Sequence, residues 1–64
     1  MITQRNETIA VKAMVYNLPK ELRAGFVVAR QDCGNLWYYG TYDDYRRALE
    51  VACDLENGVV LEVE

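Results

Sequence analysis

The sequence contains no histidine and no serine, and it has one proline, four glycines and two cysteines. Without histidine and serine, the chain cannot assemble a Ser-His-Asp or Cys-His catalytic arrangement from its own residues. Cys33 and Cys53 stand far apart and form no CxxC pair, so the four nitrogen and sulfur ligands of a structural zinc site are missing. We therefore expect no enzymatic activity, no bound metal and no cofactor.

The sequence also lacks a long apolar run and a secretory signal. A membrane-spanning helix needs about 20 consecutive apolar residues, and no stretch of this chain approaches that length. The sequence therefore predicts a cytoplasmic protein with no membrane partner and no native disulfide. We expect a single domain, residues 1–64, in which residues 1–8 are frayed because they show no sustained periodicity.

The small size of the chain bears on its stability. The core of a protein of 64 residues rarely contributes more than about 3–5 kcal/mol. Disulfides, structural metals and oligomerisation are the usual sources of additional stability, and the first two are not expected here. We therefore predict a homodimer or a complex with a protein partner.

The periodicity of apolar residues predicts an α+β fold in the order β-β-β-α-β. Residues 9–16, 26–31, 36–40 and 59–64 are the predicted strands, and residues 43–56 carry apolar side chains at helical spacing. We expect a small, mainly antiparallel sheet with the helix packed on one face. Asp43 or Thr41 is the expected N-cap of the helix, and Asn57-Gly58 is the expected stop.

The two middle strands are predicted to form a hairpin around residues 32–35. Loops of two or four residues give the same register, with Gln31 opposite Leu36, Arg30 opposite Trp37 and Val28 opposite Tyr39. Alternation along the strands then separates two faces. The face under the helix is expected to hold Val27, Ala29, Leu36 and Tyr38, and the open face Arg30, Trp37 and Tyr39.

Aromatic residues are concentrated in one part of the chain: Trp37, Tyr38, Tyr39, Tyr42 and Tyr45. One helix cannot cover both faces of the strand that carries them, so some of these rings are expected to be exposed. Because Trp, Tyr and Arg are enriched at binding hot spots, we predict an interaction surface. Its members are Arg30, Trp37, Tyr39 and Tyr42. The alternative is that Arg30 stacks on Trp37 within the monomer and the tyrosines cap a small core.

A nucleic-acid-directed protein is the main alternative function. Exposed rings beside arginine suit a single-strand binder, and the eight acidic residues of positions 31–64 suit an acidic nucleic-acid mimic. Against the first, the net charge of −3 disfavours a phosphate-binding groove. The adjacent Asp43 and Asp44 do not face each other on a helix, so we interpret them as capping residues and not as a catalytic pair.

Several short motifs resemble a pattern found in small uncharacterised proteins of phages, prophages and related mobile elements. They are VVAR at 27–30, LWYYG at 36–40, the pair Asp43-Asp44, and Ala48, Val51 and Ala52. The resemblance covers roughly residues 26–63 and implies no catalytic residues. It implies a protein that acts by binding a host protein. From the residues and the resemblance together, we predict a non-enzymatic interaction module that self-associates through its aromatic sheet face.

Overall fold

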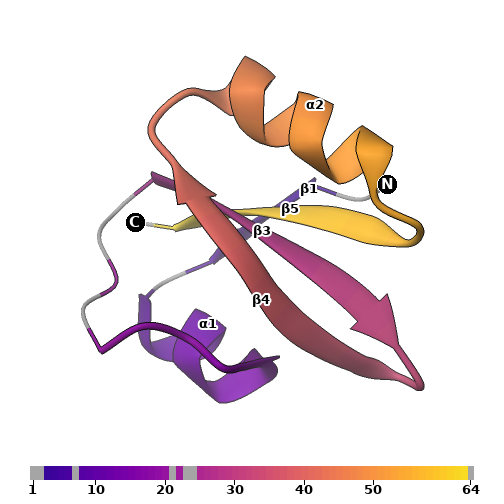
Figure 1. The fold of residues 1–64 in the computed structure, drawn as a ribbon. Coiled ribbons are helices and arrows are strands. Elements are labelled where there is room, and N and C mark those ends of the chain that lie inside the picture. Colours follow the sequence, from indigo (N-terminus) through magenta and orange to yellow (C-terminus); the bar gives the residue numbers. More distant parts are fainter. Residues whose placement is uncertain (1–2, 7, 21, 23–24, 64) are drawn as a thin grey trace.

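The computed structural model describes residues 3–6, 8–20, 22 and 25–63. Its elements confirm the α+β class (Figure 1). In chain order they are β1 (Thr3–Asn6), α1 (Thr8–Met14), β2 (Val15–Tyr16), β3 (Gly25–Asp32), β4 (Asn35–Tyr42), α2 (Tyr45–Asp54) and β5 (Gly58–Val63). None of the helices in these described ranges is long and apolar enough to cross a bilayer.

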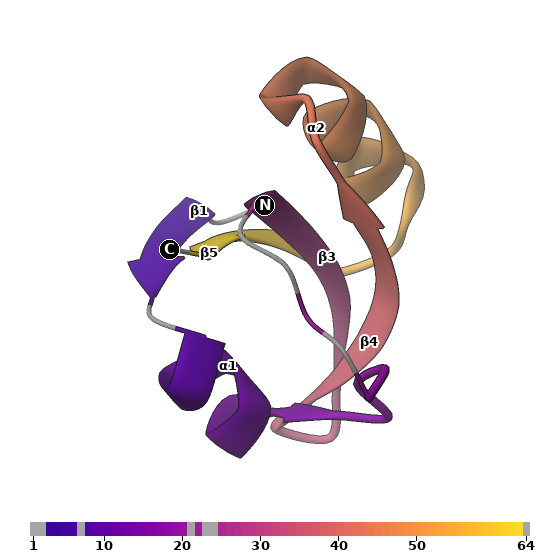
Figure 2. The same cartoon turned by 90° about the vertical axis from the view of Figure 1, so that its left-hand side faces the viewer.

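The strands form one curved sheet in the order β1-β5-β3-β4-β2. β3 is antiparallel to both of its neighbours, whereas the outer strands β1 and β2 run parallel to β5 and β4. Figure 2 shows that the sheet bends around α1, which lies between its two edges, and that α2 lies on the opposite, convex side. We call the side toward α1 the inner face and the side toward α2 the outer face.

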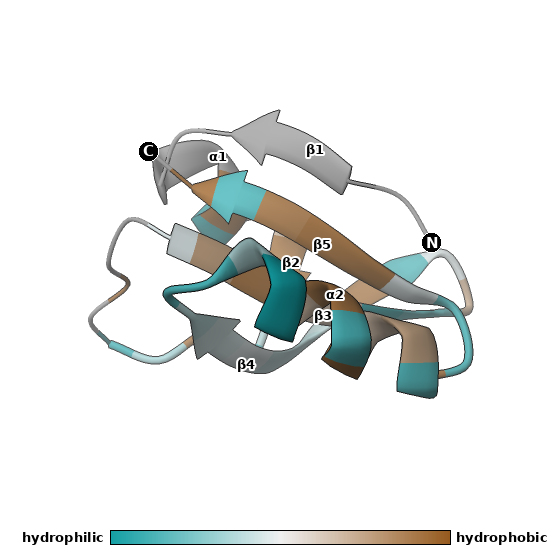
Figure 3. Cartoon of the chain, turned by 90° about the horizontal axis from the view of Figure 1, so that it is seen from above, coloured by the Kyte–Doolittle hydropathy of each residue, from teal (hydrophilic) through white to brown (hydrophobic). Residues whose placement is uncertain are grey.

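Each face of the sheet has its own apolar cluster. The inner cluster comprises Val11, Val15, Val27, Ala29, Val59, Leu61 and Val63, with Leu18, Leu22, Leu36 and Tyr38 packed against it. The outer cluster comprises Val28, Ala48, Ala52 and Val60, with Phe26, Tyr42, Val51 and Leu55 around it. Figure 3 shows the apolar residues running along β3 and β5 beneath α2. Strands β3 and β5 are therefore apolar on both faces.

The prediction of a strand over residues 9–16 was wrong for most of its length. Thr8–Met14 form α1, and only Val15–Tyr16 are extended. Val11 and Val15 are buried while the three residues between them are exposed, which is the spacing of a helix. The apparent alternation depended on alanines, which are the best helix formers.

The expectation that residues 1–8 are frayed also fails for Thr3–Asn6, which pair with β5. Residues 1, 2 and 7 lie outside the described part.

Helix α2 is confirmed, with different details at its ends and on its buried side. Its N-cap is Asp44, whose carboxylate accepts a hydrogen bond of 3.2 Å from the backbone N–H of Arg46. The expected caps, Asp43 and Thr41, do not take this position. Ala48 and Ala52 are buried, so the helix approaches the sheet closely. The helix ends at Asp54 with Leu55 as its C-cap, before the predicted stop at Asn57-Gly58, although Asn57 does adopt a left-handed conformation with φ of 59°.

The hairpin register is confirmed near the turn and wrong further along. Arg30 lies opposite Trp37 and Gln31 opposite Leu36, but Val28 lies opposite Gly40 because the register shifts between Val28 and Ala29. The shift is a β-bulge that leaves Tyr39 as the extra residue. A single extra residue inverts the alternation beyond it.

The two groups of residues separate as predicted, but the main helix covers the other face. Val27, Ala29, Leu36 and Tyr38 were expected under the main helix, yet they belong to the inner cluster on the side of α1. Helix α2 instead covers the face of Val28 and Val60. Because α1 was interpreted as a strand, the sequence offered only one helix to cover the sheet, and the wrong face was chosen for it.

The hairpin turn contains one strained residue and gives a testable prediction. Cys33 and Gly34 have φ of 52° and 82°, the pattern of a type I′ turn, in which asparagine is favoured at the first position. Cys33→Asn is expected to stabilise the fold by about 1 kcal/mol, because asparagine tolerates the left-handed conformation better than cysteine does. Urea unfolding measures the change.

The other exposed cysteine provides the control for this prediction. Cys53 lies in α2, where its backbone is helical, so Cys53→Asn is expected to give no stabilisation. If both substitutions change the free energy of unfolding equally, removal of a thiol is the cause and the turn explanation is wrong.

Candidate functional site

The candidate site is a group of exposed side chains on the outer face, near the hairpin turn. β2 and β4 place Tyr16 beside Trp37, and β3 places Arg30 on the other side of Trp37. Tyr39 lies two positions after Trp37 on β4, where it is the extra residue of the bulge, and its ring is exposed. We call these four residues the aromatic surface: Tyr16, Arg30, Trp37 and Tyr39.

The rings of the aromatic surface are exposed although the protein is small. Tyr16, Trp37 and Tyr39 keep 53%, 40% and 55% of their area accessible. The buried apolar residues of the described chain are only valine, alanine and leucine, and the largest fully buried side chain is Leu61. The core therefore does not contain the rings of Tyr16, Trp37 and Tyr39, and their large apolar area remains available for binding.

Trp37 packs against Tyr16 and not against Arg30. The centroids of the Tyr16 and Trp37 rings are 5.1 Å apart, with an angle of 34° between the ring planes, which lies in the range of favourable aromatic pairs. Arg30 is exposed, and within the described ranges no ion pair or ring contact engages its guanidinium group. The alternative in which Arg30 stacks on Trp37 is therefore not seen.

The uncovered position of this surface follows from the placement of α2. Both Figures 1 and 2 show the hairpin turn at the end of the sheet farthest from α2. Helix α2 packs over Val28 and Val60 and ends near Gly58, where a β-carbon would collide with the carbonyl oxygen of Ala52. The part of the outer face on β4 and β2 extends beyond the helix.

Tyr42, the fourth predicted member of the interaction surface, lies elsewhere. It is half-buried and packs in the outer cluster, and its ring lies over Gly40. The structure thus brings together Arg30, Trp37 and Tyr39 and separates Tyr42 from them. In its place stands Tyr16, which sequence reasoning missed because the parallel pairing of β2 with β4 leaves no local signal.

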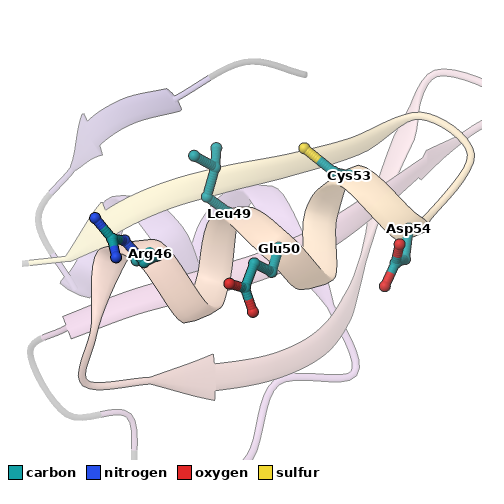
Figure 4. Close-up of a pocket in the computed structure, with 5 residues that line it drawn as sticks. All are labelled: Arg46, Leu49, Glu50, Cys53 and Asp54. Atoms are coloured by element: carbon teal, nitrogen blue, oxygen red, sulfur yellow. The ribbon is translucent and has the colours of Figure 1, made fainter.

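A second, open concavity lies on the outward side of α2 (Figure 4). Arg46, Leu49, Glu50, Cys53 and Asp54 line it. All five come from the same helix, and they surround no enclosed space that could exclude water from a reaction. In the part of the chain that the structure describes, no three potential ligands gather to hold a metal ion. The aromatic surface is therefore the stronger candidate site.

Comparison with known proteins leaves the family open. No family model, curated protein or solved structure matches this chain. The similarity of its short motifs to phage and prophage proteins stays a prediction from the sequence.

Proposed function

We propose that this protein is a non-enzymatic protein-interaction module that binds through the aromatic surface. The observation that carries the proposal is the exposure of Tyr16, Trp37 and Tyr39 together beside Arg30, while the core is built from smaller side chains. Large rings with polar edges and an arginine are the residues that contribute most of the energy at protein interfaces. Both cysteines are free and exposed, which suits the proposed cytoplasmic setting. The phage-type motifs favour a host protein as target.

Site-specific cross-linking tests this proposal. Replacing Tyr39 with the photoreactive residue p-benzoyl-phenylalanine is expected to give covalent products with protein in cells that express the chain. The same replacement at Tyr45 is the control, because Tyr45 has a similarly exposed ring, 41% accessible, outside the aromatic surface. Products from position 39 should be identified by mass spectrometry and should disappear when Trp37→Ala is added.

Three outcomes contradict the proposal. Products that contain only nucleic acid favour the alternative function, and their formation should then decrease steeply with salt concentration. Identical products from positions 39 and 45 show unspecific contact. The absence of any product at position 39 removes the aromatic surface as a binding site.

A further inference from the structure

A residue of opposite charge, Asp32, lies near Arg30 of the aromatic surface on the same strand. Arg30 and Asp32 are both exposed residues of β3 and stand two positions apart, so their side chains point to the same face. Two residues of a strand span roughly 7 Å. Asp32 accepts only a 3.7 Å contact from the thiol of the adjacent Cys33, and Arg30 has no ion-pair partner in the described residues.

This spacing makes the surface complementary to itself. We propose that the aromatic surface binds a second copy of this chain, related by a two-fold axis that passes level with Gln31. Such an axis places Arg30 against Asp32 of the partner subunit and Asp32 against the partner subunit's Arg30. Closed two-fold contacts of this kind repeat each interaction twice. The inference rests on the proposed function, because it names the partner of the same surface.

The charges around the surface favour a second copy over a strongly charged partner. Taken together with Asp32, the aromatic surface carries one positive and one negative charge, so this region has no net charge. An acidic ligand would also meet the net charge of −3 of the whole chain. A second copy matches this charge pair.

The exposed area sets the expected strength of the dimer. Aromatic side chains bury 150–250 Å² each when fully covered, so three rings at about half exposure offer roughly 300 Å² per copy. Stable interfaces bury about 800 Å² per partner. The contact is therefore smaller than a permanent interface, and we expect a reversible dimer with a dissociation constant on the order of micromolar.

Charge exchange tests the two-fold arrangement. Sedimentation velocity over concentrations from about 10 µM to about 1 mM should show reversible dimerisation of the wild-type protein. Arg30→Asp and Asp32→Arg should each raise the dissociation constant at least about tenfold, because each places like charges together twice. The double variant, Arg30→Asp with Asp32→Arg, should restore it to within about threefold of wild type, since the pairs are again opposite in sign.

Two results would overturn the proposal that a second copy binds this surface. A wild-type protein that stays monomeric over this range overturns the second-copy inference, and so does a double variant that fails to recover. Circular dichroism verifies the fold of each variant, and Arg30→Gln replaces any variant that does not fold, with a weaker dimer again expected. The cross-linking at position 39 separates this failure from that of the proposed function. A product with another protein preserves the function and rejects the second copy, whereas no protein product rejects both.

Discussion

Gly58→Ala is expected to unfold most of the protein at room temperature. Gly58 is buried at the start of β5, and a β-carbon at this position would lie 2.3 Å from the carbonyl oxygen of Ala52 and 3.0 Å from its α-carbon. Both are backbone atoms at the end of α2, so relief requires the helix to move away from the sheet. Overpacking of this kind costs roughly 1–3 kcal/mol or more, which is comparable to the total stability expected for so small a core.

Thermal unfolding followed by circular dichroism measures this effect. Gly34→Ala is the matched control, because a β-carbon there meets no atom within 4 Å and only the left-handed φ of 82° opposes it. Its cost should be about 1 kcal/mol. Adding Ala52→Gly to Gly58→Ala should give no rescue, since the clash involves the carbonyl oxygen and not the methyl group. A rescue would show that the side chain, and not the helix backbone, limits the approach.

Trp37→Ala is expected to weaken association strongly while leaving the α+β fold intact. Trp37 lies at the centre of the aromatic surface, between Tyr16 and Arg30. Central aromatic residues of interfaces typically contribute at least about 2 kcal/mol, which corresponds to an increase of the dissociation constant by roughly 30-fold. The loss of its contact with Tyr16 should lower stability by about 1 kcal/mol. Sedimentation velocity and circular dichroism measure the two effects separately.

A control variant with equal exposure makes this test specific. Tyr45 keeps 41% of its area accessible, against 40% for Trp37, but it lies on α2 and contacts Phe26. Tyr45→Ala should therefore leave the dissociation constant within about threefold of wild type. If Trp37→Ala instead unfolds the chain, the ring belongs to the structural core and the aromatic surface must be withdrawn.

The tryptophan also reports on binding without any substitution. It is the single tryptophan of the sequence, so fluorescence excited selectively at tryptophan comes from the site alone. Its emission should shift to shorter wavelengths as the protein concentration rises, because association removes water from the indole.

The second half of the sequence predicts its structure well because its signals are local. The turn at Cys33-Gly34, the left-handed conformation of Asn57 and the helical spacing of Ala48 and Ala52 all depend on residues near in sequence. The pairings next to the turn, including Arg30 with Trp37, follow from the same loop. Two of the four predicted interaction residues therefore have the neighbours that the sequence predicted.

The first half was predicted poorly because its structure depends on distant residues. Val11 and Val15 fit both a strand, at even spacing, and a helix, at a spacing of four. The inner cluster decides between them by burying both side chains against Val27 and Leu61. Tyr16 joins the site only through pairing with a strand about twenty positions later. No pattern within residues 9–16 contains that information.

The bulge at Tyr39 escaped prediction for a different reason. An extra residue in one strand has no clear composition signature here, because Tyr38, Tyr39 and Gly40 fit a regular strand equally well. The consequence was large for the site. The bulge places Gly40 and Tyr42 on the outer face, the same face as Trp37, but Tyr42 packs in the outer cluster with α2 and is separated from the aromatic surface.

The two outer strands of the sheet come from the same short N-terminal stretch. β1 pairs with β5 at one border and β2 pairs with β4 at the other, and α1 connects them across the inner face. Unpaired borders are where sheets join other chains and aggregate. A proteolytic cut near α1 is therefore expected to weaken the pairing of both outer strands and to leave the borders of β5 and β4 open to other chains.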